Sequence, residues 1–406
     1  MEIIAGGITA AKGFLAVGGE AGIKPNGKDL AMVVCQVPAR VAAVFTTNRV
    51  QAAPVMWSRR IVLEGKPVRA VVINSGNANA STGSTGLEHA IAMAETAAQV
   101  IGVDAREVLV ASTGVIGVPL PIERITKGIV TLFPQLAAGI EAGDSAAQAI
   151  RTTDTVSKQA AVRVEVDGHW VTIGGMAKGS GMIHPNMATL LGFITTDAAI
   201  SKELLERALR SSVADSFHMI SVDGDTSTND TVAVLANGLA QNPEITQVGV
   251  AYDRFAAALH AVSLSLAKQI IRDGEGATKL VEVRVAGALS GQAARVLAKS
   301  VITSTLVKTA LFGEDANWGR VLAALGYSGA EFNPAGVSIR FVSDAGEVRV
   351  MDEGEPVWFD EDLARQVLHP AEVLIEVQLA DGPGQATAWG CDLSYEYVKI
   401  NGEYRS

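Results

Sequence analysis

The spacing of hydrophobic residues changes near residue 280, and this change constrains the fold more than any other feature of the chain. Before that point, short apolar runs alternate with longer amphipathic stripes, and after it polar and apolar residues mostly alternate one by one. A period of two is typical of half-exposed strands, and a period of 3.6 is typical of helices. Because strands and helices are mixed without strict βαβ alternation, the sequence predicts a layered α+β fold rather than a doubly wound parallel sheet.

Several segments before residue 280 show these patterns clearly. Runs rich in β-branched residues at 69–73 and 107–110 predict buried strands, with a helix between them that stops at Gly102. Asp167-Gly168 separates two alternating runs, and it predicts a hairpin because this pair supplies the positive φ angles of a type I′ turn. A further helix is predicted after Ser201, which is a suitable N-cap.

The longest amphipathic stripe lies between residues 252 and 270, and it predicts a helix that ends at 272–274. Beyond it, alternating runs predict strands at 280–285, 338–342, 347–350 and 372–377. We therefore divide the chain into a main α+β body, residues 1–280, and a strand-rich C-terminal part, residues 281–406.

Composition narrows the class of partner. The chain has 406 residues, of which 48% are hydrophobic, and its 33 Lys and Arg against 43 Asp and Glu give a net charge of −10. Nucleic acids and anionic membranes attract basic surfaces, so neither is expected as a partner, and small metabolites are favoured. No window of about 18 residues is free of charge and glycine, so no transmembrane helix is expected.

Cysteine and histidine usage argues against a disulfide scaffold and against a metal site. Cys35 and Cys391 are the two cysteines, and neither has a metal-ligand partner at the usual spacing. The six histidines lie in no recognisable catalytic context. We expect no metal and a reducing, cytoplasmic compartment.

Common catalytic motifs are absent from the sequence. It contains no Gly-x-Ser-x-Gly elbow, no Walker loop and no Gly-x-Gly-x-x-Gly that opens a helix after a strand. What stands out is a set of loops rich in small and polar residues, which let backbone N–H groups and hydroxyls approach a ligand closely. These loops are 74–79, 111–114, 152–155 and 178–182. The last one runs on into an apolar strand and places Thr189 at the junction.

At this junction the chain resembles the glutamate N-acetyltransferase / ornithine acetyltransferase family of arginine biosynthesis. The resemblance covers essentially the whole chain, because further blocks match in the family's order. They are Phe45-Thr46-Thr47-Asn48, residues 74–80, Ser112-Thr113-Gly114, Thr152-Thr153-Asp154-Thr155, residues 223–230, residues 272–277 and residues 308–320.

The resemblance implies a layered α/β/β/α sandwich and a chain that cuts itself between Ala188 and Thr189. The products would be an alpha piece, residues 1–188, and a beta piece, residues 189–406. Thr189 would then be an N-terminal nucleophile, whose own α-amine serves as the base that a hydroxyl needs.

Roles for other residues follow from the same resemblance. Thr113 and Gly114 match the positions that form the oxyanion hole. Six positions match substrate contacts: Thr152, Lys178, Thr189, Glu275, Asn401 and Ser406. Lys178 suits a carboxylate as a compact cation, and Glu275 suits the ammonium group of ornithine.

The implied reaction moves an acetyl group from N-acetylornithine to glutamate through an acetyl-Thr189 intermediate. Acetyl-CoA is a possible second donor, and no bound cofactor is expected. The two pieces are expected to associate further, as in a heterotetramer. Two alternatives stay open at this point: an amidase or aminopeptidase of a related self-cleaving fold, and a metabolite-binding protein without catalysis.

Overall fold

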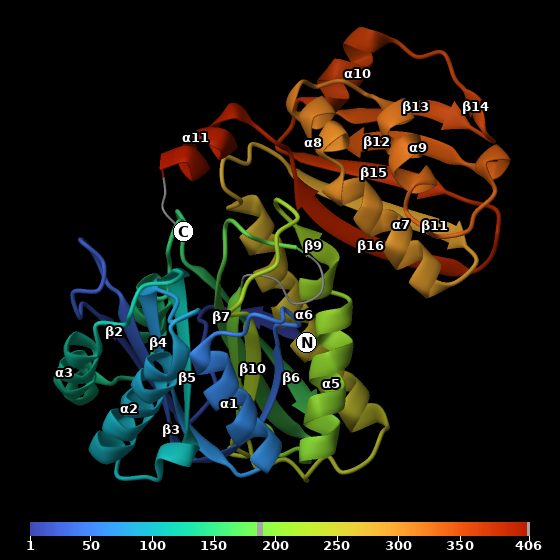
Figure 1. Cartoon of the computed structure of the whole chain (residues 1–406). Helices are drawn as coiled ribbons and strands as arrows, with labels where there is room; N and C mark the ends of the chain where they lie inside the picture. Colours follow the sequence, from blue (N-terminus) through green and yellow to red (C-terminus); the bar gives the residue numbers. More distant parts are fainter. Residues whose placement is uncertain (185–189, 404–406) are drawn as a thin grey trace.

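The computed structural model describes residues 1–184 and 190–403, which form two β-sheets with helices packed against them (Figure 1). The helices are α1 (Ala53–Glu64), α2 (Gly83–Ile101), α3 (Ile122–Leu132), α4 (Ile140–Ala149), α5 (Lys202–Ala214), α6 (Val250–Arg272), α7 (Gly291–Thr303), α8 (Thr305–Phe312), α9 (Trp318–Gly326), α10 (Glu361–Leu368) and α11 (Tyr395–Glu403). The strands are β1 (Glu2–Ile4), β2 (Phe14–Gly19), β3 (Leu30–Phe45), β4 (Val68–Asn77), β5 (Val108–Val115), β6 (Lys158–Val166), β7 (His169–Lys178), β8 (Leu191–Thr196), β9 (Ile220–Ser221), β10 (Thr231–Ala236), β11 (Leu280–Ala288), β12 (Ser338–Ser343), β13 (Gly346–Asp352), β14 (Glu355–Pro356), β15 (Glu372–Gln378) and β16 (Gly384–Cys391).

The first sheet bends over on itself at β3. The first half of this strand pairs with β2 and β4, and its second half, after an irregularity between Val34 and Ala39, pairs with β10. The strand order is β1-β6-β7-β8-β10-β3-β4-β5. Met176 and Phe193 on β7 and β8 share a buried cluster with Val72 on β4, so the two halves of the sheet pack face to face.

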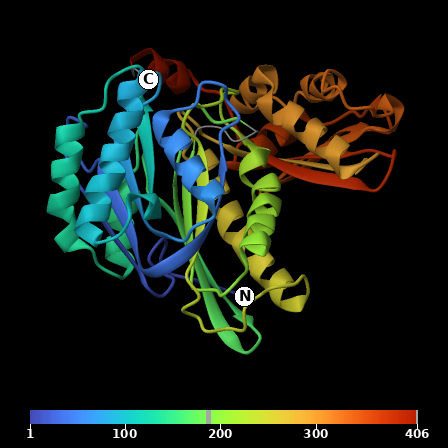
Figure 2. The ribbon, with the colours of Figure 1, turned by 60° about the horizontal axis from the view of Figure 1, so that its bottom comes forward.

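Helices cover both outer faces of this folded sheet. On one side α1 and α2 pack on β5, and α3 packs on α2; on the other, α5 packs on β3, and α6 on β6 and β7 (Figures 1 and 2). Helix, sheet, sheet and helix therefore follow one another as four layers. This arrangement confirms the layered α+β fold class predicted from the sequence.

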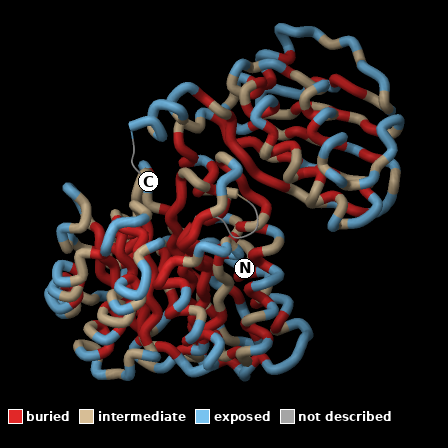
Figure 3. Tube along the Cα trace, in the orientation of Figure 1, coloured by how far each residue is buried: buried red, intermediate tan, exposed pale blue. Residues whose placement is uncertain are grey.

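The second sheet has the order β14-β13-β12-β15-β11-β16-β9 and lies at one end of the first body (Figure 1). Helix α7 packs on β11 and β16, and α10 packs on β12 and β13. One continuous buried core joins both bodies, since Phe255 and Leu266 of α6 belong to the same cluster as Val283 and Ile375 (Figure 3). Strand β9 belongs to the second sheet, although it precedes residue 280 in the sequence. The division of the chain into two parts at residue 280 stays a prediction.

The local predictions agree with the described structure. Gly102 ends α2 with a φ of 80°, and Asp167 and Gly168 join β6 to β7 with φ angles of 47° and 79°. The side chain of Ser201 accepts a hydrogen bond from the N–H of Leu204 and caps α5. The alternating runs beyond residue 280 form β11, β12, β13 and β15. In the described part of the chain, no helix has the length and apolar character needed to cross a membrane.

Candidate active site

Thr113 and Gly114 lie near the end of β5, where this strand runs parallel to β4. Thr113 pairs with Ser75, and Gly114 pairs with Gly76. Gly114 has a φ of +128°, and a Cβ atom at this position would lie 2.3 Å from the carbonyl carbon of Gly76. Only glycine fits at position 114. The close approach of β5 to β4 at this point therefore places the two predicted oxyanion donors, the hydroxyl of Thr113 and the N–H of Gly114.

Lys178 is the last residue of β7, and its side chain is buried beside Thr113. Its Nζ atom donates to Oγ1 of Thr113 across 3.4 Å. Burial lowers the pKa of Lys178, and the negative charge of Asp154 opposes this shift. The carboxylate of Asp154 thus favours the charged form of Lys178 at the wall of the cavity, against the effect of burial.

A buried ion cluster lies beneath Lys178. Nζ of Lys158 is 2.6 Å from Oδ1 of Asp154 and 2.6 Å from Oδ2 of Asp273. Asp154 also accepts from the N–H groups of Thr152, at 3.0 Å, and Gly179, at 2.7 Å. This cluster ties together the loop after α4, the ends of β6 and β7 and the turn after α6.

Glu275 lies in the turn that follows α6 and faces the same cavity. Its N–H donates to the carbonyl oxygen of Ser180, and its carboxylate accepts from Nδ2 of Asn401 at 2.8 Å. A Cβ on Gly181 would come within 2.2 Å of the Glu275 carboxylate. Helix α11 thus brings Asn401 over the site from the far end of the chain (Figure 1).

These residues surround one cavity of about 200 Å³. Among the site residues predicted from the sequence, its lining includes Thr113, Gly114, Thr152, Lys178, Glu275 and Asn401. Of the other predicted residues, Ala188, Thr189 and Ser406 lie outside the described part of the chain. All predicted site residues that are described therefore come together.

The described chain resumes at Leu190, next to the cavity wall. The N–H of Leu190 donates to Oδ1 of Asp230 at 2.9 Å, and the next residue, Leu191, pairs with Lys178. Asp230 is fully buried, and burial raises its pKa well above the usual range. Its Oδ2 atom has no hydrogen-bond partner within residues 1–184 and 190–403.

Sequence reasoning missed several polar residues of this region. Asp154, Asp223 and Asn229 each lie in a block that resembles the family, but no role was assigned to them. Asp223 accepts from the N–H groups of Met182 and Ile183 and shapes the loop that follows β7. Acidic residues inside a Gly- and Thr-rich block were the signal that could have identified them.

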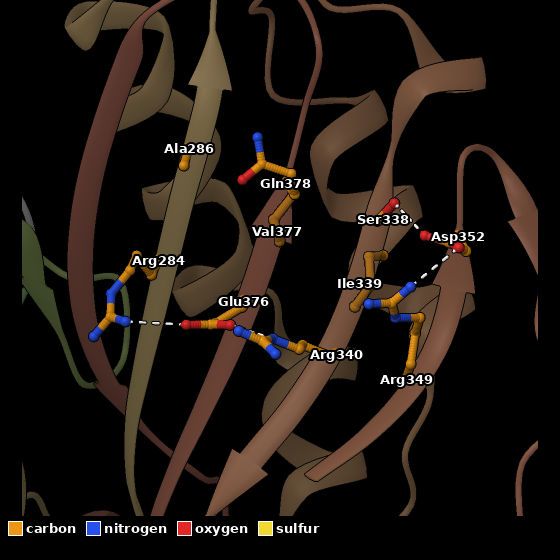
Figure 4. Close-up of a pocket in the computed structure, with 10 residues that line it drawn as sticks. All are labelled: Arg284, Ala286, Ser338, Ile339, Arg340, Arg349, Asp352, Glu376, Val377 and Gln378. Carbon is orange, nitrogen blue, oxygen red and sulfur yellow. Dashed lines mark hydrogen bonds and ion pairs between the residues drawn. The ribbon is translucent and has the colours of Figure 1, made fainter.

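A larger cavity, of about 410 Å³, lies on the open face of the second sheet (Figure 4). Its charged side chains pair with one another: Glu376 accepts from Arg284 and Arg340, and Asp352 accepts from Arg349 and Ser338. Each charged side chain that lines this cavity is therefore engaged by another described residue. The smaller cavity is therefore the candidate active site.

No group of His, Cys, Asp and Glu side chains within the described ranges is arranged to hold a metal ion. Cys35 and Cys391 are both buried and free. The described residues that line the cavity offer hydroxyls, backbone N–H groups, the amino group of Lys178 and the carboxylates of Asp223, Asp225 and Glu275.

Comparison with known proteins identifies the family. The model of the ArgJ family matches residues 15–406. The arginine biosynthesis bifunctional protein ArgJ of Symbiobacterium thermophilum is 56% identical, and the protein of the same name from Caldanaerobacter subterraneus subsp. tengcongensis is 52% identical; each match covers 100% of both chains. The chain belongs to the ArgJ family. This membership agrees with the resemblance found in the sequence, and it makes the protein an acetyltransferase of arginine biosynthesis.

A solved structure is also similar. The arginine biosynthesis bifunctional protein argJ from Bacillus halodurans is 47% identical, with a TM-score of 0.50. The match covers 98% of that chain but 52% of this one. The solved ArgJ chain therefore corresponds to about half of the present ArgJ family member.

Proposed function

We propose that this ArgJ family member transfers the acetyl group of N-acetylornithine to glutamate through an acetyl ester on Thr189. One observation carries the proposal: Thr113, Gly114, Lys178 and Glu275, together with residues from four other segments, line one cavity. The cavity combines oxyanion donors with a cation and an anion. That combination matches an acetylated amino acid better than it matches a peptide.

Charge explains how one cavity would accept both substrates. Each substrate carries an α-carboxylate, for which Lys178 and the hydroxyl of Thr152 are suitable donors. The side chain of N-acetylornithine ends in an ammonium group, and Glu275, held by Asn401, is a carboxylate of the cavity that suits such a cation. Both substrates then bind in turn at the same donors, as a ping-pong cycle requires.

The nucleophile in this proposal is made by self-cleavage. The hydroxyl oxygen of Thr189 attacks the carbonyl carbon of Ala188, the C–N bond breaks, and water hydrolyses the resulting ester. Cleavage frees the α-amine of Thr189, whose pKa in model compounds is ~7.7–8.0, so it can accept the hydroxyl proton near neutral pH. The match to the solved ArgJ chain supports this step, because that chain is covered over 98% of its length and yet corresponds to 52% of this chain, as one piece of a cleaved precursor would.

Acetyl transfer repeats the same chemistry on the substrate. Oγ1 of Thr189 attacks the acetyl carbon of N-acetylornithine while the α-amine takes the hydroxyl proton, and that proton leaves with the ornithine nitrogen. Thr113 and Gly114 stabilise the oxyanion, a task for which one donor is typically worth ~10²–10³ in rate. The amino group of glutamate then attacks the ester, and Thr189 is regenerated.

The remaining features of the proposal concern partners and location. Acetyl-CoA serves as a second acetyl donor, no bound cofactor takes part, and the alpha and beta pieces assemble into a larger oligomer such as a heterotetramer. The proposal places the protein in the cytoplasm, a reducing compartment in which the free thiols of Cys35 and Cys391 are usual.

An acetyl-transfer assay tests the proposal. Purified protein is supplied with N-acetylornithine or acetyl-CoA, with and without glutamate, and N-acetylglutamate and free acetate are both measured. Transfer to glutamate that exceeds acetate release supports the transferase. Acetate release that glutamate does not suppress would favour the amidase alternative.

A further inference from the structure

The buried carboxylate of Asp154 contacts several segments of the site at once. It accepts hydrogen bonds from Lys158, Gly179 and Thr152, and Nζ of Lys178 lies 4.0 Å from its Oδ2 atom. Its side chain has no exposed surface. Burial works to raise the pKa of Asp154, but the charges of Lys178 and Lys158 outweigh it and hold this pKa well below its usual range.

Lys178 depends on this carboxylate. The side chain of Lys178 is 4% exposed. Among the described ion pairs, its Nζ atom pairs with the carboxylate of Asp154. Lys158 is already paired with both Asp154 and Asp273. Two buried cations and two buried anions therefore balance one another, and loss of either anion leaves an uncompensated positive charge.

The charged form of Lys178 sets the direction of the hydrogen bond to Thr113. An ammonium group only donates, so in this form Oγ1 of Thr113 accepts from Nζ of Lys178. The hydroxyl proton of Thr113 must then point away from Lys178. Since Thr113 and Lys178 both line the cavity, that proton is available to an oxyanion formed there.

We propose that Asp154 is a positioning residue of the oxyanion hole, which keeps Lys178 charged and in place so that Lys178 orients the hydroxyl of Thr113. The inference rests on the proposed function, because it takes Thr113 as an oxyanion donor. Asp154 touches no substrate in this account. It acts through Lys178, and Lys178 acts through Thr113.

Several titratable groups lie near Lys178, and each comes from a different element. They are Asp154 in the loop before β6, Lys158 on β6, Glu275 after α6, Asp230 before β10 and Lys24 before β3. Asp154 is the strongest of those that favour the charged form. Removal of its charge should therefore lower the pKa of Lys178 further.

The test variant is Asp154→Asn, which keeps the size of the side chain and one acceptor oxygen. Each variant is followed to complete self-cleavage by denaturing electrophoresis, and kcat and KM for acetyl transfer are then measured across pH. We expect kcat to fall ~10-fold or more, less than the ~10²–10³ typical of losing an oxyanion donor outright. We also expect the alkaline decline of kcat to begin at a lower pH than in the wild type.

Asp273→Asn is the matched control, because it removes the other carboxylate that pairs with Lys158. It should cost similar stability but leave the alkaline decline of kcat in its wild-type position. If the two variants share one pH profile, Asp154 only stabilises the fold and the inference is wrong. If a variant does not complete self-cleavage, the pH dependence of its cleavage rate gives the same comparison.

A double variant separates this inference from the proposed function. If Asp154 acts through Thr113, Thr113→Ala/Asp154→Asn should be no slower than Thr113→Ala alone. Losses that multiply would overturn the inference and leave the oxyanion role of Thr113 intact. A wild-type kcat in Thr113→Ala would instead contradict the proposed function.

Discussion

The sequence predicts the roles of Thr113 and Gly114, and the structure explains why these residue types are needed there. Their roles were predicted from the resemblance to a family, but the requirement for glycine is explained by the contact between Gly114 and the backbone of Gly76. The hydrogen bond from Lys178 to Thr113 joins residues 65 positions apart in the sequence. No local pattern predicts such a contact, because it depends on how β5 and β7 are brought together.

The first prediction concerns the hydroxyl of Thr113. Thr113→Ala should lower kcat for acetyl transfer by ~10²–10³ and change KM far less, because the donor is needed mainly when negative charge develops. Thr131→Ala, which removes an exposed hydroxyl bonded within α3, is the control and should behave as the wild type. A raised KM with unchanged kcat would make Thr113 a substrate contact instead.

A second prediction follows from the buried carboxyl of Asp230. Its pKa in the folded protein is raised by burial, so the fold favours the protonated form. This carboxyl therefore costs no stability below its unfolded pKa of ~3.9, and the cost grows as pH rises toward the folded pKa. Asp230→Asn should unfold at a higher temperature than the wild type at neutral pH, and the difference should disappear near pH ~4.

Thermal unfolding followed by circular dichroism across pH measures this effect. Asp104→Asn provides a control of opposite sign, because hydrogen bonds from Arg106 lower the pKa of Asp104 to about 2. That variant should gain no stability at neutral pH. If Asp230→Asn is less stable than the wild type at neutral pH, the carboxylate form contributes to the fold and this account of Asp230 is wrong.

Among the elements, the strands were predictable and their assembly was not. Hydrophobic period identified β4, β5, the β6–β7 hairpin and, after residue 280, β11, β12, β13 and β15, because period reports which face of an element is buried. It could not reveal that β3 takes part in both halves of the first sheet. Nor could it show that Asp154 and Asp273, which are far apart in sequence, share Lys158.

Helix α11 gives a third prediction, because none of its described residues is buried and yet Asn401 bonds Glu275 inside the cavity. Removing residues 401–406 should leave self-cleavage intact, since that step needs only Thr189 and its oxyanion donors. It should raise KM for glutamate and raise the ratio of acetylornithine hydrolysis to transfer, because water gains access to the acetyl-enzyme.

Two single substitutions sharpen this experiment. Asn401→Ala should reproduce part of the rise in KM, whereas Lys399→Ala should not, because among residues 1–184 and 190–403 the side chain of Lys399 pairs with Glu396 on the same helix. Wild-type transfer and KM in the truncated protein would show that the end of the chain is dispensable.

On the scale of the whole molecule, one continuous core joins the two sheets, and residues from both parts of the chain line the site. The turn with Glu275 follows α6, whose apolar side chains belong to that core, and α11 follows β16 of the second sheet. The C-terminal part therefore supplies residues to a cavity built mainly by the first body. The sequence resemblance anticipated this sharing, but only the packing of α6 between the two sheets explains it.

The proposed mechanism depends most on a covalent acetyl group at Thr189, the N-terminus that self-cleavage creates. Purified protein is mixed with N-acetylornithine without glutamate, and intact-mass and peptide mass spectrometry follow. We predict two pieces, residues 1–188 and 189–406, of which the larger gains the mass of one acetyl group on Thr189 and loses it when glutamate is added. A fully active protein that remains one uncut chain, or that never carries acetyl on Thr189, would contradict the account.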